Sequence, residues 1–228
     1  MHDPLLAGIS AILFDMDGVI VDSMPHHARA WRTVLGKHGL TLQDEDIFRR
    51  EGMTGSSSVI DIFREKGINP PDNDELTNLQ NLKDKIFEEA QISLYPGIRD
   101  IITRLSSSGY KLGLVTGSFR RSVYHSIPPE ILTLFDVTVT AEDVTRGKPD
   151  PEPYIRAMQK CGCLPVNTLV VENAPMGIAA AKSAGARCIA IKTTLGQDFL
   201  SKSDAIVNDH VELMDFFIRR IPQLAGLK

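Results

Sequence analysis

Asp15 and Asp17 stand two residues apart, directly after the apolar run at residues 11–14. A carboxylate held at the end of a buried strand costs free energy unless it is paired or used in chemistry. Asp15 could attack phosphorus as a nucleophile and form an aspartyl phosphate. Asp17 could protonate the leaving group and then deprotonate the water that releases the phosphate. Such acidic pairs are also common in structural turns, but three partner sites further along the chain favour phosphoryl transfer.

Two of these partner sites offer hydrogen-bond donors and a positive charge. Thr116, Gly117 and Ser118 follow a second apolar run, and their hydroxyl and backbone N–H groups suit phosphoryl oxygens. Lys148 follows a third run, and its ammonium would screen Asp15 from the phosphate that it attacks. A loop lysine taken alone is more often a solvated surface residue. We predict that Thr116 and Lys148 are catalytic and that Gly117 and Ser118 bind the substrate.

The third partner site is the pair Glu172 and Asn173, which follows the apolar run at 168–171. Carboxylate and amide oxygens are the hard ligands that Mg²⁺ prefers in proteins. Together with Asp15, this pair predicts a Mg²⁺ site. The metal would neutralise the phosphate and align it for in-line attack.

These residues need a sheet to bring them together. Short apolar runs, rich in β-branched residues and each followed by turn residues, lie at 11–14, 112–115, 137–140, 168–171, 188–191 and, more weakly, 205–207. Helical patterns at 97–109, 150–161 and 175–184 alternate with them. Alternation of buried strands with helices predicts a doubly wound, Rossmann-like α/β core with a parallel sheet. Ligands bind beyond the carboxyl ends of such strands, where all four sites fall.

The segment 23–93 interrupts this alternation with three amphipathic helical patterns and no convincing strand. The first has its apolar face at Ala28, Trp31, Val34 and Leu35, the second at Val59, Ile62 and Phe63, and the third at Leu76, Leu79, Leu82 and Ile86. We therefore predict an α/β core at 1–22 and 94–228, with a helical domain inserted at 23–93.

Composition narrows the classes of partner. The net charge of −4 over 228 residues leaves no basic excess to neutralise nucleic-acid phosphates, and no apolar run reaches the roughly 18 residues of a membrane span. The first ten residues lack the pattern of a signal peptide. The three cysteines fit neither a disulfide framework nor a zinc site. We expect a cytoplasmic monomer that acts on a small phosphorylated substrate and binds neither nucleic acid nor membrane.

The chain resembles the haloacid dehalogenase superfamily of phosphohydrolases in four motifs that appear in order. The matching segments are FDMDGVIVDS at 14–23, VTGS at 115–118, GKPDPEPY at 147–154 and VENAPMGIAA at 171–180. The resemblance implies that Asp15 is the nucleophile and Asp17 the general acid/base. It also implies that the Asp17 backbone carbonyl binds Mg²⁺, and that the helical insertion is a cap that closes over the site.

Within the superfamily the chain looks like the subgroup of β-phosphoglucomutase, phosphoglycolate phosphatase and a bacterial inorganic pyrophosphatase. Most members have Asp where this chain has Asn173. Asn removes a negative charge, and Glu51 in the insertion offers a replacement carboxylate. The pyrophosphatase resembles the chain in both features, since it combines Asn in the fourth motif with a Glu in the cap. The mutase instead has Lys at position 51 and Arg at position 55, where this chain has Gly55, which argues against mutase activity.

Inorganic pyrophosphate is therefore the leading expected substrate, with Glu51 reaching the metal from the cap. Lys83 is the best cap cation for the distal phosphate, with a surface lysine an equal alternative. His27 is a candidate substrate contact, although packing on the Trp31 face is slightly favoured. The alternatives are a sugar-phosphate or phosphoglycolate-type phosphatase, a β-phosphoglucomutase, or a catalytically inactive protein that binds a phosphorylated ligand.

Overall fold

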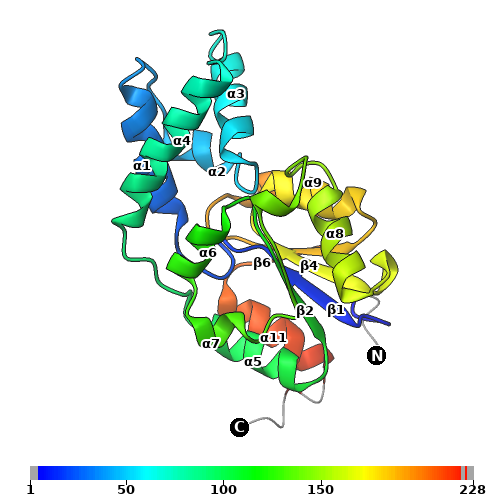
Figure 1. Cartoon of the computed structure of the whole chain (residues 1–228). Helices are drawn as coiled ribbons and strands as arrows, with labels where there is room; N and C mark the ends of the chain where they lie inside the picture. Colours follow the sequence, from blue (N-terminus) through cyan, green and yellow to red (C-terminus); the bar gives the residue numbers. More distant parts are fainter. Residues whose placement is uncertain (1–4, 222–223, 225–228) are drawn as a thin grey trace.

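The described residues, 5–221 and 224 of the computed structural model, contain a six-stranded parallel sheet (Figure 1). Its strands are β1 (Ala11–Phe14), β2 (Lys111–Val115), β3 (Val137–Val139), β4 (Thr168–Glu172), β5 (Arg187–Ile191) and β6 (Ala205–Val207). Their order across the sheet is β3-β2-β1-β4-β5-β6, so the chain reverses its direction of winding between β1 and β4. This confirms the predicted doubly wound, Rossmann-like sheet.

Helices cover both faces of the sheet. They are α5 (Ile98–Ser107), α6 (Arg120–Ser126), α7 (Pro129–Leu132), α8 (Glu152–Cys161), α9 (Pro175–Ser183), α10 (Gln197–Leu200) and α11 (His210–Arg220), with short 3-10 turns at Ala141–Asp143 and Pro165–Asn167. Because side chains alternate along a strand, Ile12 and Phe14 of β1 pack with α5 and α11, whereas Leu13 packs with α8 and α9. Figure 1 shows these two helical layers on either side of the strands.

The inserted segment forms four helices that pack on one another and stand above the carboxyl ends of the strands (Figure 1). They are α1 (Met24–Gly36), α2 (Asp44–Phe48), α3 (Gly55–Glu65) and α4 (Asn73–Glu88), and we call them together the cap. Trp31, Ile62 and Leu79 lie in its apolar centre. The three predicted helices are confirmed, and α2 was not predicted. The predicted apolar face of α4 is wrong at Leu82, which is 45% exposed and lies outside the apolar centre of the cap.

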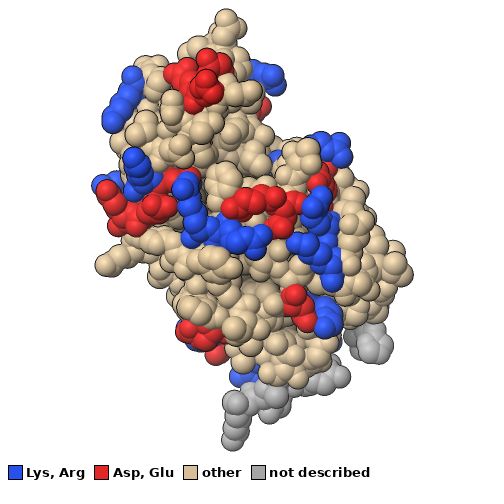
Figure 2. Space-filling model, viewed as in Figure 1, with Lys and Arg blue, Asp and Glu red and all other residues tan. Residues whose placement is uncertain are grey.

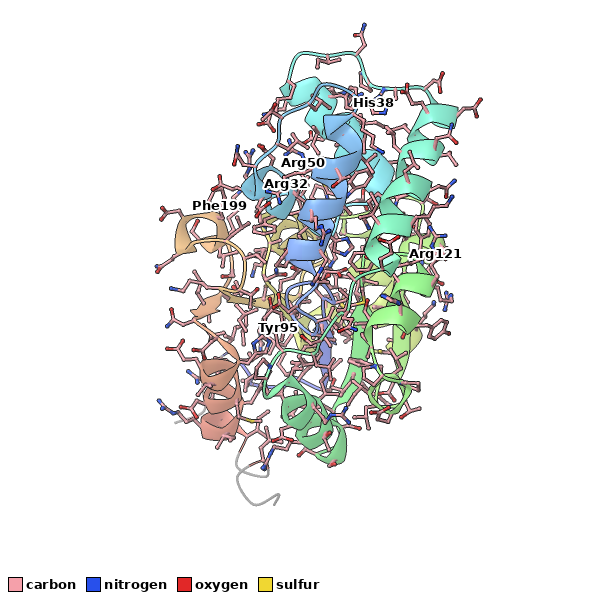
Figure 3. The ribbon with its side chains drawn as sticks, turned by 90° about the vertical axis from the view of Figure 1, so that its left-hand side faces the viewer. Arg32, His38, Arg50, Tyr95, Arg121 and Phe199 are labelled. Atoms are coloured by element: carbon pink, nitrogen blue, oxygen red, sulfur yellow. The ribbon has the colours of Figure 1, made fainter. Side chains whose placement is uncertain are left out.

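Two connecting segments join the cap to the core and pair with each other. Val21 and Leu94 form an antiparallel bridge, and the Asp22 N–H donates to the Ser93 carbonyl at 2.9 Å. The hydroxyl of Tyr95, a residue labelled in Figure 3, donates a hydrogen bond to Asp22 at 3.1 Å. We propose that the domain boundaries lie in this pair of segments, at residues 22–23 and 93–94. Residues 1–4, 222–223 and 225–228 of the predicted core lie outside the described residues.

Positively and negatively charged side chains lie next to one another on the surface. On the face drawn in Figure 2, Lys and Arg side chains lie beside Asp and Glu side chains. Ion pairs such as Arg120–Asp143, at 3.0 Å, and Arg146–Asp150, at 3.2 Å, have this character. Among the described residues, no helix combines the length and apolar character needed to cross a bilayer.

Candidate active site

The carboxyl ends of β1, β2 and β4 place three predicted residues side by side. The Asp15 N–H continues the ladder to the Val171 carbonyl at 3.0 Å, and the Thr116 N–H bonds to the Val139 carbonyl at 2.9 Å. Glu172 is itself the last residue of β4. Because the strands are parallel and in this register, their side chains emerge at one edge of the sheet. The four sequence motifs therefore converge there.

Lys148 joins two buried carboxylates at this edge. Its Nζ donates to Asp15 Oδ1 at 2.5 Å, to Glu172 Oε1 at 2.7 Å and to the Val115 carbonyl at 3.1 Å. Lys148 is 2% exposed and Asp15 1% exposed. The Tyr154 hydroxyl also donates to Glu172 Oε1, at 2.6 Å. Lys148 is thus held at three acceptors, and the surface-lysine alternative is wrong.

Burial and charge act in opposite directions on this cluster. Burial raises the pKa of Asp15 well above its usual range; Lys148 lowers it, and the nearby Glu172 charge raises it again. Burial lowers the pKa of Lys148, but the charges of Asp15 and Glu172 outweigh this and raise it. Lys148 is therefore a permanent cation, and Asp15 is a carboxylate that needs further positive charge to stay ionised.

Asp17 has a different environment, although it lies two residues away. Ser23 Oγ donates to its Oδ1 at 2.6 Å, and Ser118 Oγ and Thr116 Oγ1 donate to its Oδ2 at 3.0 and 3.3 Å. Burial raises the pKa of Asp17, but the nearby His27 and the hydrogen bonds from His27, Ser23 and Ser118 outweigh burial and lower this pKa below the usual range. The two carboxylates have opposite pKa shifts, as acid/base pairs in active sites do.

His27 both packs and reaches the site. Its Nε2 lies 3.0 Å from Asp17 Oδ1, and its ring stacks on Phe87 with centroids 4.1 Å apart. Burial lowers the pKa of His27, and the nearby Lys83 charge lowers it further. The contact with Asp17 was the less favoured sequence interpretation. The aromatic partner is Phe87 of α4, which the sequence pattern did not indicate.

A cap loop between α2 and α3 enters the site. Glu51 Oε2 accepts a bond from Asn173 Nδ2 at 2.7 Å and lies 3.4 Å from Thr194 Oγ1. Gly52 has a φ of +82°, which favours glycine, and a Cβ there would lie 2.6 Å from the Lys148 side chain. The cap is thus docked on the core in this structure, with Glu51 beside the fourth motif.

Three buried oxygens of the site lack a hydrogen-bond partner among the described residues: Asp15 Oδ2, Glu51 Oε1 and Asn173 Oδ1. An orphaned buried acceptor is costly unless a ligand or ion completes it. No group of three or more His, Cys, Asp or Glu side chains within residues 5–221 could hold a metal ion. The oxygen donors here instead combine two carboxylates with one amide, a set that suits a hard cation.

A cavity of about 60 Å³ lies between the cap and the core beside Asp17. We call it the cap–core cavity. Its wall includes the predicted residues Asp17, His27, Glu51, Lys83, Gly117 and Ser118. It also includes Gln80 and Asp84 of α4, which sequence reasoning missed. Their signal would have been helical spacing, because Gln80 lies one turn before both Lys83 and Asp84.

The six-stranded α/β core, the inserted helices and the buried Asp–Lys–Glu cluster at the strand ends define a class of phosphoryl-transferring hydrolases. A family model described as haloacid dehalogenase-like hydrolase matches residues 12–191. The chain belongs to this family. Its relatives include phosphatases, and the chain is a phosphoester hydrolase.

Validoxylamine A 7'-phosphate phosphatase of Streptomyces hygroscopicus subsp. limoneus is 30% identical to the chain, covering 88% of it and 94% of that protein. Hexitol phosphatase A of Escherichia coli (strain K12) is 30% identical, covering 86% and 89%. Pyrophosphatase PpaX of Oceanobacillus iheyensis is 26% identical, covering 88% and 93%. The β-phosphoglucomutase of Clostridium difficile has the same fold, with a TM-score of 0.80 at 22% identity over 95% of this chain and 97% of that one.

Proposed function

We propose that the chain hydrolyses a small phosphorylated metabolite through an aspartyl phosphate on Asp15. The observation that supports this best is the 2.5 Å bond from Lys148 Nζ to the buried Asp15 Oδ1. It fixes the orientation of a buried carboxylate whose other oxygen, Oδ2, lacks a hydrogen-bond partner among the described residues. In the proposed reaction Oδ1 forms a bond to phosphorus while the bond from phosphorus to the leaving oxygen breaks. Water then attacks phosphorus and restores the Asp15 carboxylate.

Asp17 moves the protons in this scheme. It donates one to the leaving oxygen in the first step and takes one from the attacking water in the second. In the resting protein Asp17 is ionised, because His27 and two hydroxyl donors lower its pKa. A bound phosphate dianion beside it would raise that pKa. We therefore assign its protonation to the substrate complex.

The residues fit a Mg²⁺ ion, which haloacid dehalogenase-type phosphatases generally use. Asp15 Oδ2, Glu51 Oε1 and Asn173 Oδ1 are the orphaned oxygens that would hold it, with the Asp17 carbonyl as a further expected ligand. When bound, the metal would offset the negative charge of the phosphate and of Asp15. Asn173 supplies an amide oxygen without a charge, and Glu51 supplies the charge from the cap.

Glu172 was expected to be a metal ligand, and we now propose another role for it. Its Oε1 accepts bonds from Lys148 and Tyr154, and its Oε2 accepts the Asn173 N–H at 3.0 Å. Both oxygens are already satisfied by protein donors. We propose that Glu172 holds Lys148 at Asp15.

Inorganic pyrophosphate is one proposed substrate. It is supported by the pairing of Glu51 with Asn173, by Lys83 in the cavity wall, and by the similarity to PpaX. The leaving group of pyrophosphate is a phosphate anion, which needs positive charge around it. The cavity wall also contains Arg50, but its guanidinium bonds to Asp61 at 2.8 Å and to Glu65. Lys83 is left to bind the distal phosphate.

A hydroxylated phosphomonoester, such as a sugar or hexitol phosphate, is the second candidate. Gln80 Oε1 is buried in the same wall without a hydrogen-bond partner among the described residues. An acceptor of this kind suits a hydroxyl donor of the substrate. The relatives that act on phosphorylated sugars or hexitols agree with this candidate.

Steady-state rates with Mg²⁺ on pyrophosphate, glucitol 6-phosphate, 2-phosphoglycolate and β-glucose 1-phosphate separate these candidates. A kcat/KM for pyrophosphate no higher than that for generic monoesters would reject pyrophosphate. Asp15→Asn should abolish turnover of every substrate, and retained turnover would reject the covalent scheme. The cytoplasmic location and the monomeric state stay predictions.

A further inference from the structure

Asp84 of the cap is a buried carboxylate that no step proposed above uses. It is 3% exposed. Its Oδ1 accepts from Gln80 Nε2 at 2.8 Å and from Lys83 Nζ at 3.4 Å, and its Oδ2 accepts from Arg121 Nη2. A buried carboxylate has to be neutralised by such partners. Two cations therefore compete for one carboxylate at the edge of the cap–core cavity.

Arg121 belongs to the core, whereas Asp84 belongs to the cap. Arg121 lies in the first turn of α6, and Figure 3 shows it beside the lower end of α4. Its Nε also lies 3.7 Å from Glu88 Oε1 of α4. The bond to Asp84 thus exists while the cap is docked and is lost when the two parts separate.

Lys83 is the cation that faces the cavity. Its Nζ lies 4.8 Å from the centre of the Phe87 ring and 5.9 Å from that of Trp31. Within residues 5–221, its hydrogen bond to Asp84 is a long one of 3.4 Å. An ammonium has three donors, so Lys83 keeps donors for an anion in the cavity. A stronger hydrogen bond from Lys83 to Asp84 would leave less of the Lys83 positive charge available to an anion in the cavity.

We infer that Arg121 is a positioning residue that makes the Lys83 charge available to the substrate. When the cap is docked, the Arg121 guanidinium pairs with Asp84 and neutralises its negative charge. The Lys83 ammonium then stays directed at the cavity. Without Arg121, the buried Asp84 has Lys83 as its nearest cation and draws it away, because a buried carboxylate left unpaired is costly. Docking of the cap and binding of the phosphorylated substrate are coupled through this exchange of partners. The inference rests on the proposed function for the anion that Lys83 meets.

The test compares Arg121→Ala and Arg121→Lys with Arg120→Ala. Arg120 is the neighbouring residue of α6, and its side chain pairs with Asp143 of the core, at 3.0 Å. The assay is Mg²⁺-dependent hydrolysis of inorganic pyrophosphate, whose distal phosphate is the anion proposed for Lys83. Losing the charge-assisted bond should raise KM about tenfold for Arg121→Ala. We expect kcat to change much less, because Lys83 contributes binding that is common to ground and transition states. Arg121→Lys should bring KM back close to the wild-type value, and Arg120→Ala should have the wild-type KM.

A second readout does not depend on catalysis. Trp31 is the only tryptophan of the chain, lies in the cavity wall and is 5% exposed. In Arg121→Ala, but not in Arg120→Ala, the cap should be docked less often and acrylamide should quench Trp31 more strongly. Unchanged thermal midpoints would show that the variants fold. If KM and quenching of Arg121→Ala both match those of Arg120→Ala, the inference is refuted. Failure of the proposed function would appear instead as turnover by Asp15→Asn.

Discussion

Replacing Lys148 by Met tests the central electrostatic cluster most directly. Met keeps the length and apolar stem of the side chain, but it removes the ammonium that joins Asp15 and Glu172. All three side chains are at most 2% exposed, so water cannot replace the lost charge. Removing one partner of a buried ion pair costs about 3–5 kcal/mol. At about 2–4 °C per kcal/mol, we expect the thermal midpoint to fall by roughly 6–20 °C.

The stability lost in Lys148→Met should depend on pH, because the pKa of Asp15 is raised in the folded state. Burial already raises the pKa of Asp15, and Lys148→Met removes the cation that opposes this rise. A carboxyl whose pKa is higher in the folded than in the unfolded state stabilises the fold at low pH, and that contribution is lost as pH rises. The stability difference from the wild type should therefore shrink as pH falls from 7.5 to 5.

Urea unfolding followed by circular dichroism measures this difference. EDTA keeps metal from giving Asp15 another cationic partner. Lys160→Met is the matched control, since Lys160 is an exposed partner of Asp143 at 3.3 Å, and exposed pairs contribute about 0–1 kcal/mol. A loss below about 1 kcal/mol for Lys148→Met, or a deficit that grows at low pH, would refute the account of the cluster.

Gly117→Ala should lower kcat/KM by about 100-fold with an unchanged circular dichroism spectrum. Its Cβ would lie 2.5 Å from the Gly52 carbonyl oxygen and 2.8 Å from that of Met53, so the cap could not dock; wild-type rates would contradict this close approach. His210→Gln should make stability less dependent on pH. Burial lowers the pKa of His210, which bonds to the Val19 carbonyl at 2.7 Å, so the unfolded chain takes up a proton first as pH falls through about 6.5. The wild type should lose stability between pH 7.5 and 5.5 in urea titrations, and an equal loss in His210→Gln would assign the effect to other groups.

The strand ends could be located from the sequence because their signal is local. The run at 11–14 is apolar and sits between polar turns, and β1 spans those residues. The parallel arrangement then follows from alternation with helices, and it carries Asp15, Thr116 and Lys148 to one edge. The α10 and α11 helices near the C-terminus were not assigned, although Asp209 caps α11 by accepting the Glu212 N–H at 2.9 Å.

The partners of the cap residues could not be derived in this way. Lys83 was selected as a cation on a helix, but its place between Asp84 and two aromatic rings depends on how α4 meets α1. Arg121 had no pattern to distinguish it from Arg120. The structure separates them, because one faces the cap and the other faces Asp143.

The roles proposed for Asp15, Asp17 and Lys148 could be predicted from the sequence alone, because residue type and position after a strand are local properties. The parallel sheet then brings these residues to one edge. The tertiary structure decided which side chains balance the charges at the site. Glu172 accepts a hydrogen bond from Lys148, and Asn173 donates one to Glu51 of the cap. The cavity lies between the docked cap and the core. These contacts join residues more than 20 positions apart. Their geometry arises from packing of the cap on the core, which no periodicity within either part encodes.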